Sequence, residues 1–154
     1  MATRQEIQIA QDLIRFVNVM NDLLDSAAYI LREIDPHTGD PYRVQDPFST
    51  ENRVATLDEI KATITRLGKS VLGYWNMLAS FKLGYGELDM DKALKALGVN
   101  ANDIVADIST FKTEAQYLSQ NIGNVINKTE LIPYADRLDA NVPKLRLVRR
   151  SWNL

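Results

Sequence analysis

Apolar residues recur every three or four positions along three long stretches of the chain, and the first stretch runs from about Arg4 to Ile34. This spacing places apolar side chains on one face of an α-helix. Thr3 and Glu6 have the spacing of a capping box at its start, and Pro36 is expected to end it. The apolar stripe is wide, with Ile7, Ile9, Ile14, Phe16, Leu23 and Ile30 on its flanks. We therefore expect several neighbours to cover it, and part of it to face another subunit.

The second stretch begins with another capping box, Thr56 and Glu59, which predicts a helix from Leu57 to about Lys82. Gly68 and Gly73 lie in its interior, where each costs roughly 1 kcal/mol relative to alanine. We expect close approach of another backbone at both glycines to compensate for that cost.

The third stretch can be capped by Asn100, and its apolar stripe extends to Val125, with Gly123 ending or loosening the helix. A short helix is expected over residues 89–97, and a brief helical turn from Pro133 to Leu138. The pattern predicts no substantial sheet. The fold class is therefore all-α: an antiparallel helical bundle of three long helices plus short helices, with an extended C-terminal arm. We expect residues 1–140 to form the body and residues 141–154 the arm.

A connection over residues 35–55 interrupts the helical pattern and contains three prolines. Its length predicts an ordered excursion, with a short strand near Tyr42–Val44. His37, the only histidine, lies there among aspartates, but the spacing does not match a calcium-binding loop. We interpret this segment as a solvated turn rather than a metal site.

Composition narrows the classes of function. The chain has 154 residues, no cysteine and a net charge of −2, and it contains no stretch of 18 uncharged apolar residues. Disulfides and thiolate metal sites are excluded, and a membrane span is not expected. The first residues lack the layout of a secretory signal, so we expect a cytoplasmic location or incorporation in a viral particle.

The common catalytic motifs are missing from the sequence, including phosphate-binding glycine loops and the HExxH and GxSxG patterns. A lone histidine in a loop cannot complete a di-metal bundle site or a conventional nucleophile–base pair. We expect no cofactor, no metal and no enzymatic activity, although a bundle enzyme that uses carboxylates alone remains an alternative.

An aromatic cluster marks the second helix and its exit: Tyr74, Trp75, Leu78, Phe81 and Tyr85. Its spacing fits a core patch, and it also fits a protein–protein contact because Trp and Tyr carry much interface energy. From this cluster we select Trp75, Phe81 and Tyr85 as candidate contact residues.

The last fourteen residues differ from the body. They carry four positive charges and no acidic residue, so residues 1–140 hold an excess of six acidic side chains. Alternation of apolar and basic residues after Pro143 is typical of an extended strand. Such an arm can fold back on its own body, dock on another subunit or protein, or contact nucleic acid. Its candidate contact residues are Leu145, Arg146, Leu147, Arg149, Arg150 and Trp152.

These patterns lead to the hypothesis of a non-enzymatic structural protein, a homo-oligomer or one subunit among other proteins. In layout the chain is similar to small connector or completion proteins of tailed-phage particles, which combine helical bodies with docking arms. The alternative is a regulatory module that binds nucleic acid or a small ligand. That role needs a basic helix face or a polar pocket, and neither is evident from the sequence.

Overall fold

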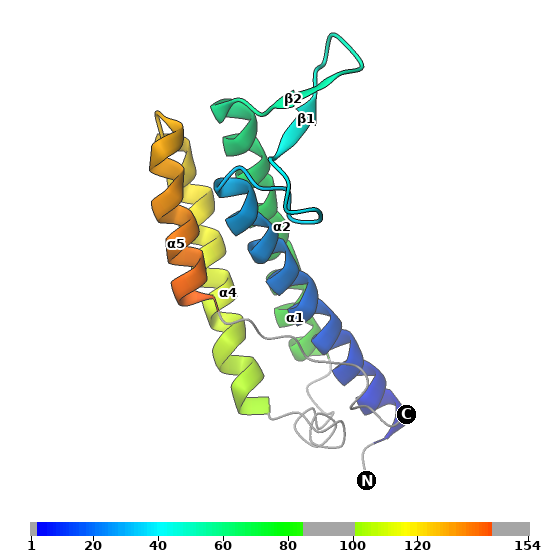
Figure 1. The fold of residues 1–154 in the computed structure, drawn as a ribbon. Helices are drawn as coiled ribbons and strands as arrows, with labels where there is room; N and C mark the ends of the chain where they lie inside the picture. The colour runs from blue at the N-terminus through cyan, green and yellow to red at the C-terminus, as the bar shows by residue number, and fades with distance from the viewer. Residues whose placement is uncertain (1–2, 85–100, 143–154) are drawn as a thin grey trace.

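A computed structural model describes the backbone of residues 3–84 and 101–142. Side chains are described for residues 3–77 and 109–142. The described part is mostly helical, as expected (Figure 1). The α-helices are α1 (Arg4–Leu31), α2 (Leu57–Gly84), α4 (Ala101–Asn121) and α5 (Leu131–Asn141), and two 3₁₀ turns are η1 (Ile122–Asn124) and η2 (Lys128–Glu130). Strands β1 (Arg43–Gln45) and β2 (Asn52–Val54) form a small antiparallel sheet. The short helix expected over residues 89–97 and the arm from Pro143 onward lie outside the described residues.

The helices pack side by side. α2 packs against both α1 and α4, while α5 packs mainly against α1, and neighbouring helices run in opposite directions (Figure 1). Their shared core includes Ile14 and Met20 of α1, Ile60 and Ile64 of α2, and Phe111 of α4, all with no exposed surface. The flanks of the α1 stripe are buried too, including Ile9 and Ile30. The expectation of several neighbours is confirmed, and these neighbours come from the same chain. The width of the stripe therefore gives no support for a second subunit.

The start of α1 at Arg4 follows the prediction with one of the two hydrogen bonds of the capping box in the described part of the chain, whereas its end differs from the prediction. The Thr3 hydroxyl accepts a hydrogen bond from the Glu6 amide at 3.1 Å. The predicted end at Ile34 is wrong, because α1 ends at Leu31. Glu33 has a φ of 58°, a left-handed conformation that cannot continue an α-helix. The chain therefore leaves the helix before Pro36 acts on it.

The two glycines of α2 behave differently. A Cβ atom added at Gly68 would lie 2.5 Å from Ser119 Oγ and 3.2 Å from the Ala115 carbonyl oxygen, so α4 does approach closely there. At Gly73 an added Cβ would meet no atom of the described residues within 4 Å, and the expected close approach is wrong.

The C-terminal part of the body is more helical than predicted. α4 ends at Asn121 and the chain changes to the 3₁₀ turn η1 around Gly123, where the sequence predicted that the helix ends or loosens. The predicted brief turn over residues 133–138 is instead the eleven-residue helix α5. Pro133 is tolerated because it lies in the first turn, where its missing amide hydrogen has no helical partner to lose. Asn141, assigned to the arm by sequence, is the last residue of this helix.

Candidate functional site

Strands β1 and β2 form a hairpin that projects beyond the ends of the helices (Figure 1). Arg43 pairs with Val54, and Gln45 pairs with Asn52. The strand expected near Tyr42–Val44 is confirmed with a shift of one residue, while its partner strand was not predicted. The signal was present, since the Asp46-Pro47 turn separates two short segments that each contain arginine and valine.

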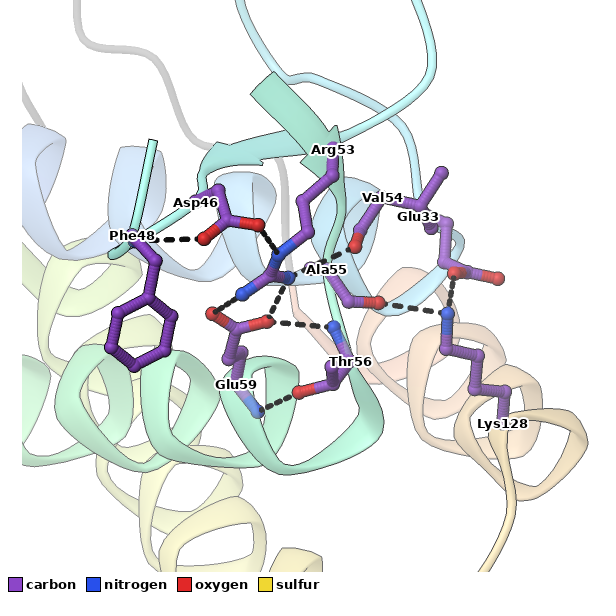
Figure 2. Close-up of polar contacts among 9 residues, drawn as sticks. All are labelled: Glu33, Asp46, Phe48, Arg53, Val54, Ala55, Thr56, Glu59 and Lys128. Atoms are coloured by element: carbon purple, nitrogen blue, oxygen red, sulfur yellow. Dashed lines mark hydrogen bonds and ion pairs between the residues drawn. The ribbon is translucent and has the colours of Figure 1, made fainter. Parts of the chain in front are cut away.

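A polar network fixes this hairpin to the start of α2 (Figure 2). Arg53 of β2 donates to both carboxylate oxygens of Glu59, at 2.6 and 3.1 Å, and its Nε lies 3.5 Å from Asp46 Oδ2. Glu59 also accepts from the Thr56 amide at 2.9 Å, and the Glu59 amide donates to the Thr56 hydroxyl at 3.2 Å. The predicted second capping box is therefore confirmed, and it carries a further function as the anchor of β2.

Charge and hydrogen bonding hold this anchor ionised. Hydrogen bonds from Arg53 and from the Thr56 amide lower the pKa of Glu59 to about 2. The hydrogen bond to Glu59 raises the pKa of Arg53 in return. The ion pair is consequently present across the whole neutral and mildly acidic range.

A second anchor holds the base of the hairpin, where β2 ends. Lys128 of η2 donates to Glu33 Oε1 at 2.7 Å and to the Ala55 carbonyl oxygen at 2.8 Å (Figure 2). One ammonium group thus joins the end of α1, the exit of β2 and the connection before α5.

The tip of the hairpin presents an aromatic side chain to solvent. Phe48 is 96% exposed, and its amide donates to Asp46 Oδ1 at 2.8 Å. In Figure 2 its ring points away from the polar network. Single exposed apolar residues are common on protein surfaces. Phe48 differs because the network that contains Asp46 and Arg53 fixes the loop that carries it.

A pocket of about 320 Å³ lies where α4, η1 and α5 meet. Its lining combines aromatic, apolar and polar side chains: Tyr117, Asn124, Val125, Glu130, Pro133, Tyr134 and Arg137. The rings of Tyr117 and Tyr134 form a tilted pair with centroids 5.8 Å apart. Ile126, next to the lining residue Val125, is 80% exposed, and its amide donates to Glu130 at 3.0 Å.

A buried carboxylate supports one wall of this pocket. Glu114 of α4 accepts from Arg137 Nε at 2.8 Å and Nη2 at 3.3 Å, and from Asn141 Nδ2 at 3.3 Å. The Arg137 guanidinium also lies 3.5 Å from the centroid of the Tyr117 ring. Glu114 is almost fully buried, and these donors offset the cost of removing its carboxylate from water. Burial, together with the neighbouring Tyr117 and Glu130, raises the pKa of Tyr134.

A basic row follows the outer face of α2. Lys61, Arg66 and Lys69, together with Ala62, Thr65 and Ser70, line an open hollow of about 600 Å³. Lys61 donates to the Val125 carbonyl oxygen at 2.7 Å, which connects the row to the aromatic pocket. Arg66 and Lys69 make no ion pair within the described part of the chain. The structure thus contains the basic helix face that was not evident from the sequence.

The predicted contact residues are only partly described. Trp75 is half-buried against the core, with Lys112 Nζ 4.1 Å from the ring centroid, whereas Tyr74 contacts Phe16 of α1 with ring centroids 5.9 Å apart. The two aromatics therefore face different helices. For Phe81 only the backbone is described, and Tyr85 lies outside the described residues, as do Leu145, Arg146, Leu147, Arg149, Arg150 and Trp152. These contacts stay predictions.

The loop around His37 is organised by its own backbone. Asp35 Oδ1 accepts from the amides of His37 and Thr38 at 2.8 and 3.1 Å, and these bonds lower the pKa of Asp35. Across residues 3–84 and 101–142, no group of three or more His, Cys, Asp or Glu residues is placed to hold a metal ion. Among the same residues, no helix is both long and apolar enough to cross a bilayer.

Comparison with protein-family models, with curated proteins and with solved structures finds no match to this chain. The features of the chain that can indicate a function are therefore its own hairpin, pocket and basic row.

Proposed function

We propose that the chain is a non-enzymatic structural protein: an antiparallel helical bundle that joins an oligomeric assembly through its hairpin tip and its C-terminal arm. The observation that carries this proposal is Phe48, 96% exposed on a hairpin held by Arg53, Glu59 and Lys128. Full burial of a Phe side chain contributes about 1.5–3 kcal/mol, which a docking partner can recover. Pre-ordering of the loop lowers the entropy lost on docking.

The layout supports this role. A helical body with a projecting, charge-fixed hairpin and a basic arm is suited to contacts with more than one neighbour. A small connector or completion protein of a tailed-phage particle has the same general layout, and we propose that class of role for the chain.

Light scattering of three proteins tests the proposal: the full chain, a Phe48→Ser variant, and a version ending at Val142. Truncation there keeps all of α5 and also Val142, which packs against the core. We expect the full chain to form a species larger than one chain, and each alteration to reduce it. Assembly that is unchanged by both alterations would refute the proposed contacts, with melting temperature as the control for folding.

A second candidate function is binding of a nucleic acid along the basic row of α2. Arg66 and Lys69 are exposed cations without ion-pair partners in the described part of the chain, as phosphate contacts require. A double Arg66→Ala, Lys69→Ala variant tests this role. If duplex DNA binds with a steep salt dependence that the variant loses, nucleic-acid binding replaces assembly as the better account.

A further inference from the structure

We propose that the hairpin tip of one copy docks into the aromatic pocket of a second copy, with Phe48 entering the space between Tyr117, Tyr134 and Pro133. This inference rests on the proposed function and names the partner as another molecule of the same chain. It joins an exposed aromatic side chain to an aromatic-walled pocket, both on the described surface.

The pocket suits an aromatic ring. Its volume of about 320 Å³ leaves room for one large side chain, and its two tyrosines are tilted by 40°. A third ring entering there can pack edge-to-face, an arrangement that adds to simple burial. Ile126, 80% exposed and adjacent to Val125 of the lining, supplies apolar surface beside the pocket for the rest of the loop.

Charge is compatible with the same pairing. The hairpin over residues 43–54 is balanced, with Arg43 and Arg53 against Asp46 and Glu51. The basic row of Lys61, Arg66 and Lys69 adjoins the pocket through the hydrogen bond from Lys61 to Val125. Docking a charge-balanced hairpin beside this row therefore does not oppose like net charges, and the ring of Phe48 selects the pocket.

The geometry points to a contact between copies. In Figure 1 the hairpin projects on the side of α1 and α2, whereas α4 and α5, which build the pocket, lie on the other side. Two different surfaces on one chain make a head-to-tail contact, which continues into a ring or an open filament.

Mixing two variants tests this contact. Phe48→Ser removes the inserted side chain, and Asn124→Trp fills the pocket from an exposed lining position. Phe48→Ser keeps an open pocket, and Asn124→Trp keeps the Phe48 side chain. We expect each alone to stay at the 17.4 kDa of one chain, and an equimolar mixture to form a species of two chains that grows no further.

Control variants are available at matched positions. Met77→Ser removes a half-exposed apolar side chain from α2, and Gln116→Trp adds a tryptophan to exposed α4 surface outside the pocket lining. Both should assemble like the unaltered chain. If the unaltered chain assembles while the mixture of Phe48→Ser and Asn124→Trp stays at one chain, the docking contact is wrong and the assembly role stands. If the unaltered chain is a single chain at every concentration, self-assembly itself is wrong.

Because the chain has no cysteine, a covalent test is also possible. Ser49→Cys, which keeps Phe48 and is exposed on the same loop, should give a disulfide-linked pair with Asn124→Cys under mild oxidation, whereas Met77→Cys mixed with Asn124→Cys should not. Equal yields from the two mixtures would contradict the contact.

Discussion

Arg53 and Glu59 form a bidentate ion pair that joins the β-hairpin to the first turn of α2, with nitrogen–oxygen distances of 2.6 and 3.1 Å. Glu59 also belongs to the capping box of that helix. One carboxylate thus orders the helix start and the hairpin together.

Removal of Arg53 should loosen the hairpin without unfolding the body. In Arg53→Met, β2 loses its contacts with Glu59 and Asp46, while the helical core is unchanged. We expect amide hydrogen exchange over residues 43–54 to accelerate several-fold and exchange in α1 to stay the same. Arg43→Met is the matched control, because Arg43 is exposed on the same hairpin and makes no ion pair in the described part of the chain. Equal acceleration in the two variants would show that the hairpin responds to the loss of a positive charge and does not depend on the Arg53–Glu59 ion pair.

Acid should release the same anchor. The folded-state pKa of Glu59 is lowered from 4.5 to about 2, so its contribution to stability is complete above pH 4.5 and is lost as the pH falls through 2. Carbon-13 NMR of the Glu59 carboxyl group should titrate near pH 2, and Arg53→Met should raise that midpoint toward 4.5. A midpoint near 4.5 in the unaltered protein would mean that the ion pair does not form in solution.

The two glycines of α2 should respond to alanine with opposite signs. At Gly73 the added Cβ has free space, so Gly73→Ala should stabilise the protein by about 0.5–1 kcal/mol through helix propensity. At Gly68 the added Cβ overlaps α4, so Gly68→Ala should destabilise it by about 1–3 kcal/mol. Urea unfolding measures both. Adding Ser119→Ala should recover part of the Gly68→Ala loss, and no recovery would place the strain elsewhere.

The pair between Glu114 and Arg137 should matter for stability. Arg137→Ala leaves a buried carboxylate with Asn141 as its one side-chain donor in the described part of the chain. We expect a loss of about 2 kcal/mol, less than for a fully enclosed pair because a third of Arg137 reaches solvent. That loss should lower the melting temperature by about 4–8 °C. Combining it with Glu114→Gln should cost less than the sum of the two single changes, since the double variant leaves no unpaired charge. Strict additivity would mean that the two groups act independently.

The sequence predicted the helices because their signals are local. Three-and-four periodicity located α1, α2 and α4, and the Thr56–Glu59 spacing located the start of α2. The predicted end of α1 was wrong because Glu33 adopts a left-handed conformation. Its side chain forms an ion pair with Lys128, which is 95 positions away and so leaves no local signal in the sequence. The prediction of close packing at Gly73 was wrong because the low helix propensity of glycine does not indicate which face of a helix contacts a neighbour.

The candidate site was largely missed because it depends on residues far apart in the chain. Arg137 and Glu114 are 23 positions apart, and Lys128 and Glu33 are 95 apart, so no local pattern connects them. The basic row escaped notice because Lys61, Arg66 and Lys69 are spaced among apolar residues of the helix. The sequence alone does not show that Phe48 is exposed. The structure shows that it is exposed on a hairpin held by the Arg53–Glu59 ion pair, which makes it a candidate contact residue.

Self-assembly through the hairpin is tested by the molar mass of the unaltered full chain, measured by sedimentation equilibrium over a wide range of concentrations. We expect a mass that rises with concentration above the 17.4 kDa of one chain. Phe48→Ser should hold the mass near that value, whereas Met77→Ser should not. A mass of 17.4 kDa for the unaltered chain at every concentration would contradict self-assembly through the hairpin.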